Sequence, residues 1–182
     1  MIRIIFTLLL LSSTLALAET SSYNGQLTFT HGDISKTVKN LPKFEDFPAE
    51  QSSTDIADDI DWKSDKNAKI FRTRLRKGLA QGPNFNGHYA VIMYGCGTMC
   101  QGNFIIDTKN GKIVGSFDSP FGASFSKNSS LVVANLRNSP IDLDEYGIVS
   151  HSPVVFFKVE NDQLISVRII KSNDLFEFED DQ

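Results

Sequence analysis

The sequence has few of the residues that metal and redox sites require. It contains two cysteines and three histidines, and no two histidines are spaced as H-x-H or H-x-x-x-H. Without either spacing, the sequence predicts no zinc site. A Walker loop and a G-x-S-x-G segment are also missing, which removes the sequence signals for a P-loop nucleotide site and for a serine hydrolase elbow. We therefore predict no cofactor, no metal ligand and no catalytic residue.

The sequence also lacks an excess of positive charge and a long apolar run. Its formal net charge is −4, which disfavours general binding to nucleic acid. The main apolar run, 4–11, is followed by Ser12, Ser13 and Thr14 and falls short of the ~20 residues that a membrane-spanning helix needs. A membrane anchor is therefore not expected.

The amino terminus instead has the features of a cleavable signal peptide. Arg3 supplies a positive charge, the apolar run follows, and Ala16 and Ala18 are small residues placed as a signal peptidase requires. We predict that 1–18 is a signal peptide and that the protein is periplasmic or secreted. No cysteine stands at the cleavage point, so the usual route to a lipoprotein is missing, and no stable membrane insertion is expected after cleavage.

The rest of the chain is long enough for one domain with a real core. Hydrophobic residues make up 41% of the sequence and include 14 phenylalanines, which favours globular folding over disorder. We predict a single domain over 19–174, followed by an acidic, frayed tail over 175–182.

Strand and turn signals dominate this domain. Alternating polar and apolar residues and turn sequences predict hairpins over 23–38, 104–114 and 153–170, with further strands at 88–93 and 131–134. The segment 41–62, which carries two prolines and seven carboxylates between 45 and 61, is predicted to be an irregular surface segment. With one helix, the pattern predicts an α+β domain built mostly from antiparallel sheet.

The helix is predicted over about 64–80, with Ser64 as N-cap and apolar residues at helical spacing until Gly82-Pro83. Its flanks carry many basic residues. That density is compatible with binding to lipid phosphates or anionic glycans. The favoured interpretation is a solvated face that complements the acidic segment before it and the helix dipole. The basic residues are Lys66, Lys69, Arg72, Arg74, Arg76 and Lys77.

The segment 81–101 is the most chemically dense part of the chain. It reads G-P-N-F-N-G-H-Y at 82–89 and G-C-G-T-M-C at 95–100. With the preceding helix, it resembles an uncharacterised family of small exported bacterial proteins that have a helix, a G-P-N-F-x-G-H-Y segment and a G-C-G-x-x-C loop. The resemblance covers about a third of the mature chain. That family has no established activity, so the resemblance assigns no catalytic residue.

Cys96 and Cys100 are expected to form a disulfide, because an exported protein meets an oxidising compartment. Gly95 and Gly97 would allow a tight loop with positive φ angles. A thiol enzyme using Cys96 and His88 is disfavoured, since an extended strand would separate them by roughly 26 Å and a disulfide would remove the nucleophile. The binding candidates in this segment are Asn84, Asn86, His88, Tyr89, Thr98 and Gln101.

Three functions remain open at this stage. The leading hypothesis is a non-enzymatic exported module that binds an envelope component or a protein partner. The first alternative is a hydrolase of cell-wall or glycan material, using His88 with a carboxylate such as Asp107 or Asp118. The second alternative is a purely structural envelope protein.

Overall fold

The computed structural model describes residues 23–98, 100–137, 140–144 and 152–176. The predicted signal peptide and residues 177–182 of the predicted tail lie outside these ranges. Antiparallel strands dominate the fold, and one helical segment accompanies them. The predicted α+β class is therefore confirmed. None of the helices in the described ranges has the length and apolar character needed to cross a bilayer.

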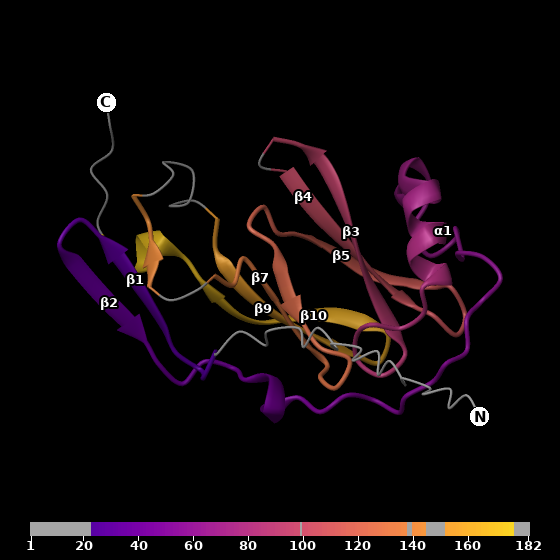
Figure 1. Ribbon diagram of the computed structural model, residues 1–182, viewed down its shortest axis with the longest axis horizontal. Coiled ribbons are helices and arrows are strands. Elements are labelled where there is room, and N and C mark those ends of the chain that lie inside the picture. The colour runs from indigo at the N-terminus through magenta and orange to yellow at the C-terminus, as the bar shows by residue number, and fades with distance from the viewer. Residues whose placement is uncertain (1–22, 99, 138–139, 145–151, 177–182) are drawn as a thin grey trace, which may run out of the picture.

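Three sheets and the helix stack in layers (Figure 1). The first sheet has the order β2-β1-β8, the second β10-β9-β7-β6, and the third β3-β4-β5. The strands are β1 Leu27–His31, β2 Ile34–Val38, β3 Tyr89–Gly97, β4 Cys100–Asp107, β5 Ile113–Asp118, β6 Ala123–Phe125, β7 Leu131–Ala134, β8 Ile141–Asp142, β9 Val154–Glu160 and β10 Gln163–Ile170. Short 3-10 turns occur at Phe44–Asp46, Asn67–Phe71 and Ser172–Asp174.

Alternation along the strands divides the core into three clusters. In β4, Phe104 and Ile106 face the helix, whereas Ile105 faces the second sheet. In β7, Val132 faces β3-β4-β5, whereas Val133 packs toward β1. The second sheet is therefore covered on both faces, as the layered arrangement requires.

The helix α1, Arg72–Ala80, continues directly from the 3-10 turn Asn67–Phe71. Asp65, rather than the predicted Ser64, accepts the first amide hydrogen bonds, from Asn67 and Ala68. The Ser64 hydroxyl instead donates to the Asp61 carbonyl and accepts from the Ile113 amide. The predicted helix is correct in place, but its first turn starts later and is 3-10 rather than α.

The segment 41–62 is irregular, as predicted, but it is not merely a surface segment. It passes along the edges of the layers between β2 and α1 (Figure 1) and buries Leu41 and Ile60. Its backbone pairs with other elements through Pro48 with Ser129 and through Asp61 with Lys112. The core also extends to Phe176, which is buried two residues inside the predicted tail.

Candidate functional site

The turn before β3 places the first group of predicted site residues. Phe85 and Tyr89 pair across it, while Asn86 (φ 42°) and Gly87 (φ 75°) adopt the left-handed conformation. A Cβ on Gly87 would lie 2.5 Å from the carbonyl oxygen of Glu50. Glycine is needed here for its backbone angle and for the close approach of a second backbone. The turn therefore docks the irregular segment onto the sheet.

Two asparagine side chains hold this turn in place. Asn84 bonds the backbone of Val91 at both ends of its amide, accepting at 2.8 Å and donating at 3.1 Å. Asn86 is fully buried, accepts from the Glu50 amide at 2.8 Å and donates to the Glu50 carboxylate at 3.4 Å. Both side chains are occupied by hydrogen bonds within the protein.

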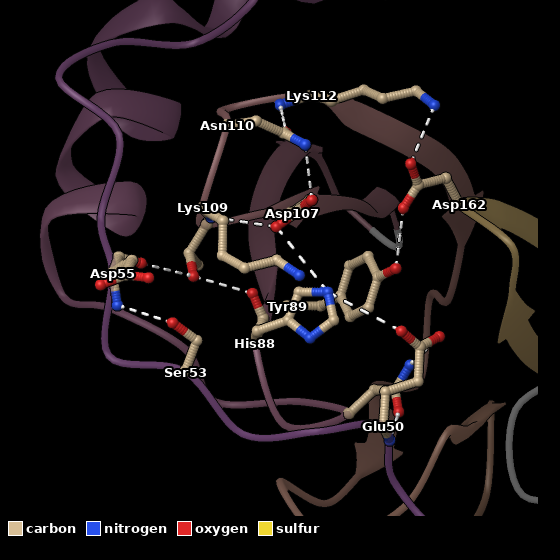
Figure 2. Close-up of polar contacts among 12 residues, drawn as sticks. Glu50, Ser53, Asp55, His88, Tyr89, Asp107, Lys109, Asn110, Lys112 and Asp162 are labelled. Atoms are coloured by element: carbon tan, nitrogen blue, oxygen red, sulfur yellow. Dashed lines mark hydrogen bonds and ion pairs between the residues drawn. The ribbon is translucent and has the colours of Figure 1, made fainter.

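His88 lies inside the resulting polar cluster, between two carboxylates (Figure 2). The residue is only 3% exposed. Its Nδ1 is 3.2 Å from the carbonyl oxygen of Gln51, and because a carbonyl can only accept, Nδ1 carries the hydrogen. Its Nε2 is 3.8 Å from Glu50 Oε2 and 3.9 Å from Asp107 Oδ1. The imidazole ring also packs on the Tyr89 ring, with 4.2 Å between centroids.

Asp107 is buried, and the hairpin turn that follows β4 occupies its carboxylate. Oδ1 accepts from the Lys109 amide at 2.9 Å, and Oδ2 accepts from the Asn110 side chain at 2.6 Å. The turn contains the predicted Asn-Gly pair, with Gly111 at φ 74°. Asp107 therefore shapes the turn as well as facing His88.

Tyr89 extends the cluster to the next sheet (Figure 2). Its hydroxyl donates to Asp162 Oδ1 at 2.8 Å, and Lys112 donates to Asp162 Oδ2 at 3.2 Å. Burial, and then the hydrogen bond to Asp162, raise the pKa of Tyr89 well above its usual value. Burial alone would raise the pKa of Asp162, but the hydrogen bonds from Tyr89 and Lys112 outweigh it and hold that pKa below its usual value.

The second group of predicted residues lies at the other end of the β3–β4 hairpin. Register pairs Tyr89 with Asp107 at one end and Gly95 with Gln101 at the other, about 20 Å apart at ~3.3 Å per residue. The six binding candidates are therefore divided into two groups. Asn86, His88 and Tyr89 are buried at one end, called the buried end, beside the exposed Asn84, and Thr98 and Gln101 lie at the other end.

The tip of this hairpin is exposed around Gly95, Gly97 and Thr98. Gly97 has φ 137°, as expected for a loop glycine, whereas Gly95 does not adopt a positive φ, so that part of the prediction is wrong. A register shift between the two glycines lets Gly97 pair with Cys100. Below the tip, Gln101 donates to the Ser119 hydroxyl at 3.2 Å.

Asn103 lies beneath this tip and is fully buried. Its amide nitrogen donates to the Ser119 hydroxyl at 2.7 Å and to the Phe117 carbonyl at 3.3 Å. Its Oδ1 has no hydrogen-bond partner among the described residues. The sequence signal for this position was a polar residue directly before the apolar run Phe104-Ile105-Ile106, and it was not singled out from the sequence.

The carboxylates proposed for a hydrolase are separated by the fold. Asp107 lies beside His88, but Asp118 pairs with Gly102 near the exposed tip, so it does not share a site with His88. Glu50 and Asp162, which complete the cluster, were not predicted. Along the described ranges, no three His, Cys, Asp or Glu side chains gather as a metal site would require.

A shallow depression beside the cluster includes Glu50, but neither His88 nor Asp107 lines it. The histidine is thus covered on the side of this depression, and its surroundings offer hydrogen bonds from the protein itself. The arrangement fixes the irregular segment, the first turn of β3 and the β4–β5 turn to one another. Its geometry is that of a buried structural network.

Comparisons with protein-family models, with curated proteins and with solved structures gave no match to this chain. The resemblance to the exported family with the G-P-N-F-x-G-H-Y segment therefore stays a prediction.

Proposed function

We propose that the chain is a non-enzymatic module that acts in the periplasm or outside the cell and binds an envelope component or a protein partner. The observation that supports it most directly is the division of the polar residues of 81–101 between a buried end and an exposed end of the β3–β4 hairpin. At the buried end, Asn86 and His88 are enclosed and serve internal contacts, and the exposed Asn84 holds the backbone of Val91. The exposed end offers Thr98 for recognition, together with the half-buried Gln101, whose side-chain amide also donates to the Ser119 hydroxyl.

A Cys96–Cys100 disulfide would hold that exposed tip rigid, and we include it in the proposal. The hairpin register supports it, because Gly97 pairs with Cys100 immediately after Cys96 in the chain. Cys100 is also not a free thiol in the structure. A rigid exposed loop loses little conformational freedom on binding.

A pull-down from envelope extract tests the loop. Thr98→Ala/Gln101→Ala is compared with the native protein and with Gln163→Ala/Ser166→Ala, a matched pair on exposed β10. We expect the loop variant to lose partners that the native protein and the β10 control recover, and Cys96→Ser/Cys100→Ser to lose them as well. Equal recovery by all four proteins would contradict the role of the loop, and recovery of no partner by the native protein would favour the purely structural alternative.

The hydrolase remains a second candidate because His88 lies within 4 Å of carboxylates of Glu50 and Asp107. The burial of His88 and its hydrogen bond to the Gln51 carbonyl disfavour the hydrolase, because a general base must reach a proton of the substrate. Purified cell-wall glycan incubated with the native protein and with His88→Gln provides the test. Release of soluble fragments by the native protein alone would replace the binding proposal with the hydrolase.

A further inference from the structure

The outer face of the helical segment has a concentration of positive charge that the rest of the chain does not share. Seven of the 18 lysines and arginines lie between 63 and 77, together with a single carboxylate, Asp65. The chain as a whole is acidic, with a net charge of −4. The charge is therefore local to one surface rather than a property of the whole protein.

The structure shows how little of this charge is neutralised by the acidic segment. Arg76 pairs with Asp59, with Nη2 2.6 Å from Oδ2. The other ion pairs among the described residues do not involve the helical segment. The expectation that the basic face complements the acidic segment is met by a single described pair, and the remaining cations point to solvent.

These cations form a stripe around an exposed isoleucine. Ala68, Leu75 and Leu79 face the core, and the opposite side is exposed throughout. Ile70, at its centre, is 77% exposed, the largest exposed fraction among the exposed large apolar residues of the described ranges. The helical stripe consists of Lys66, Ile70, Thr73, Arg74 and Lys77, all of them exposed. Thr73 and Arg74 each lie three or four residues from Lys77 on α1, and Ile70 belongs to the 3-10 turn that leads into the helix, with Lys66 as the N-cap of that turn.

The helix is also placed where a flat partner can reach it. It lies at one end of the long axis of the molecule, outside β3, while β1 and β2 lie at the other end (Figure 1). The Phe71 ring packs on Tyr94 of β3, with 4.0 Å between centroids, so the start of α1 is anchored to the sheet. The stripe thus lies on an outer end of the molecule, on a helix that is fixed to the sheet.

We propose that the helical stripe docks the protein onto an anionic phospholipid surface. This inference rests on the proposed function, because it names the bilayer itself as an envelope component, and it assigns that contact to the helical stripe rather than to the exposed hairpin tip. Lys66, Arg74 and Lys77 match the charge of anionic headgroups, each strengthening partition about fivefold. Ile70 enters the apolar boundary below the headgroups, a contact that an anionic glycan chain does not offer.

Sedimentation of the purified protein with vesicles tests the proposal. One vesicle type contains only zwitterionic phospholipid, and the other contains the same lipid mixed with an anionic phospholipid. We expect binding to the anionic vesicles that weakens with salt. Lys66→Gln/Arg74→Gln/Lys77→Gln should lower the partition coefficient about 100-fold, and Ile70→Ser should lower it about tenfold at unchanged charge.

Lys39→Gln/Lys127→Gln/Lys171→Gln is the matched control, because it removes three exposed cations from other parts of the surface. It should retain binding, and circular dichroism confirms that each variant is folded. The proposal is overturned if the native protein does not bind vesicles, including the case in which it binds an immobilised anionic polysaccharide instead. It is also overturned if both triple variants lose vesicle binding equally, or if Ile70→Ser leaves the partition coefficient unchanged.

The Cys96→Ser/Cys100→Ser protein is included to separate the two proposals. Normal vesicle binding by this variant, with loss of pulled-down partners, supports two independent surfaces. Loss of vesicle binding in the stripe variants, with normal recovery of all partners by the loop variants, would support the stripe and contradict the loop. Vesicle binding that falls with the cysteine variant but not with the stripe variants would overturn the stripe.

Discussion

Tyr89 and Asp162 join two sheets of this protein, through a hydrogen bond of 2.8 Å from the phenolic hydroxyl to the carboxylate. Tyr89 opens β3, and Asp162 lies in the turn between β9 and β10. The tyrosine is 1% exposed, so its hydroxyl has no access to bulk water as a substitute partner. The hydrogen bond therefore ties the third sheet, through β3, to the second sheet, through the β9–β10 turn.

Tyr89→Phe should lower the free energy of unfolding by about 1.5–3 kcal/mol, the range for a hydrogen bond to a charged group. The ring remains and no cavity forms, so the loss reports the hydroxyl. Tyr94→Phe is the matched control, because Tyr94 makes ring contacts with Phe71 and Phe104. Urea denaturation should show a change below about 0.5 kcal/mol for the control. Equal effects in the two variants would contradict the role of the Asp162 bond.

Alkaline pH should destabilise the protein through its buried tyrosines. Burial raises the pKa of Tyr89 and of Tyr23 above the usual 10.0, and nearby carboxylates add to the shift. A raised pKa means that the folded state binds the proton more tightly, so this stabilisation is complete below about pH 10 and is lost as pH rises above that value. Urea denaturation at about pH 8 and about pH 11 measures the loss. Tyr23→Phe/Tyr89→Phe should lose less stability over that interval than the native protein.

Gly87→Ala should destabilise the protein more than Gly32→Ala. Both glycines have positive φ, 75° and 53°, so each alanine incurs a backbone cost of about 1–2 kcal/mol. A Cβ at Gly87 would also lie 2.5 Å from the Glu50 carbonyl oxygen, whereas at Gly32 it meets nothing within 4 Å. The difference between the two midpoints of thermal unfolding isolates the steric term. Equal shifts would mean that the irregular segment is not docked on this turn.

Local patterns predicted most of the fold because they are carried by neighbouring residues. The hairpin at Asn110-Gly111 and the alternation in β1 depend on the turn type and the strand period, both of which can be read within about ten residues. The start of the helix was misplaced because Ser64 and Asp65 are both good capping residues. Tertiary bonds of Ser64 to Asp61 and Ile113 decided between them.

The site was less predictable because its members come together through distant segments. Gln51 contacts His88 across 37 residues of chain, and Asp162 contacts Tyr89 across 73. The composition of 81–101 drew attention to His88, and Asp107 was named, with Asp118, as a carboxylate that folding could bring near it; the structure places Asp107 beside His88 and Asp118 elsewhere. Composition alone could not show that His88 is buried and that Thr98 is exposed. The strand between them has the same sequence pattern whichever of its ends is enclosed by other elements.

Gly78→Ala should destabilise the protein although alanine is the better helix former. In an exposed helix this change would stabilise by about 1 kcal/mol. Here a Cβ at Gly78 would lie 2.5 Å from Cδ1 of Ile92 and within 3 Å of two more of its carbons, and overpacking of this kind costs about 1–3 kcal/mol. A double-mutant cycle with Ile92→Ala tests the cause. In the Ile92→Ala background, Gly78→Ala should become neutral or stabilising, and a cost that persists there would contradict the steric explanation.

Arg76→Gln should raise the pKa of Asp59 toward its usual value. The guanidinium donates to both carboxylate oxygens, at 2.8 and 2.6 Å, and these bonds, followed by one from the Ile60 amide, hold the pKa of Asp59 well below 3.8. A lowered pKa means that the pair stabilises the fold above the unfolded-state pKa and that this contribution is lost as pH falls below it. Carbon-detected NMR titration of the Asp59 carboxyl measures the shift. Arg74→Gln, which removes an equal charge without touching Asp59, should leave the titration unchanged, and a similar shift in both variants would show that the effect is one of general charge rather than of the bidentate pair.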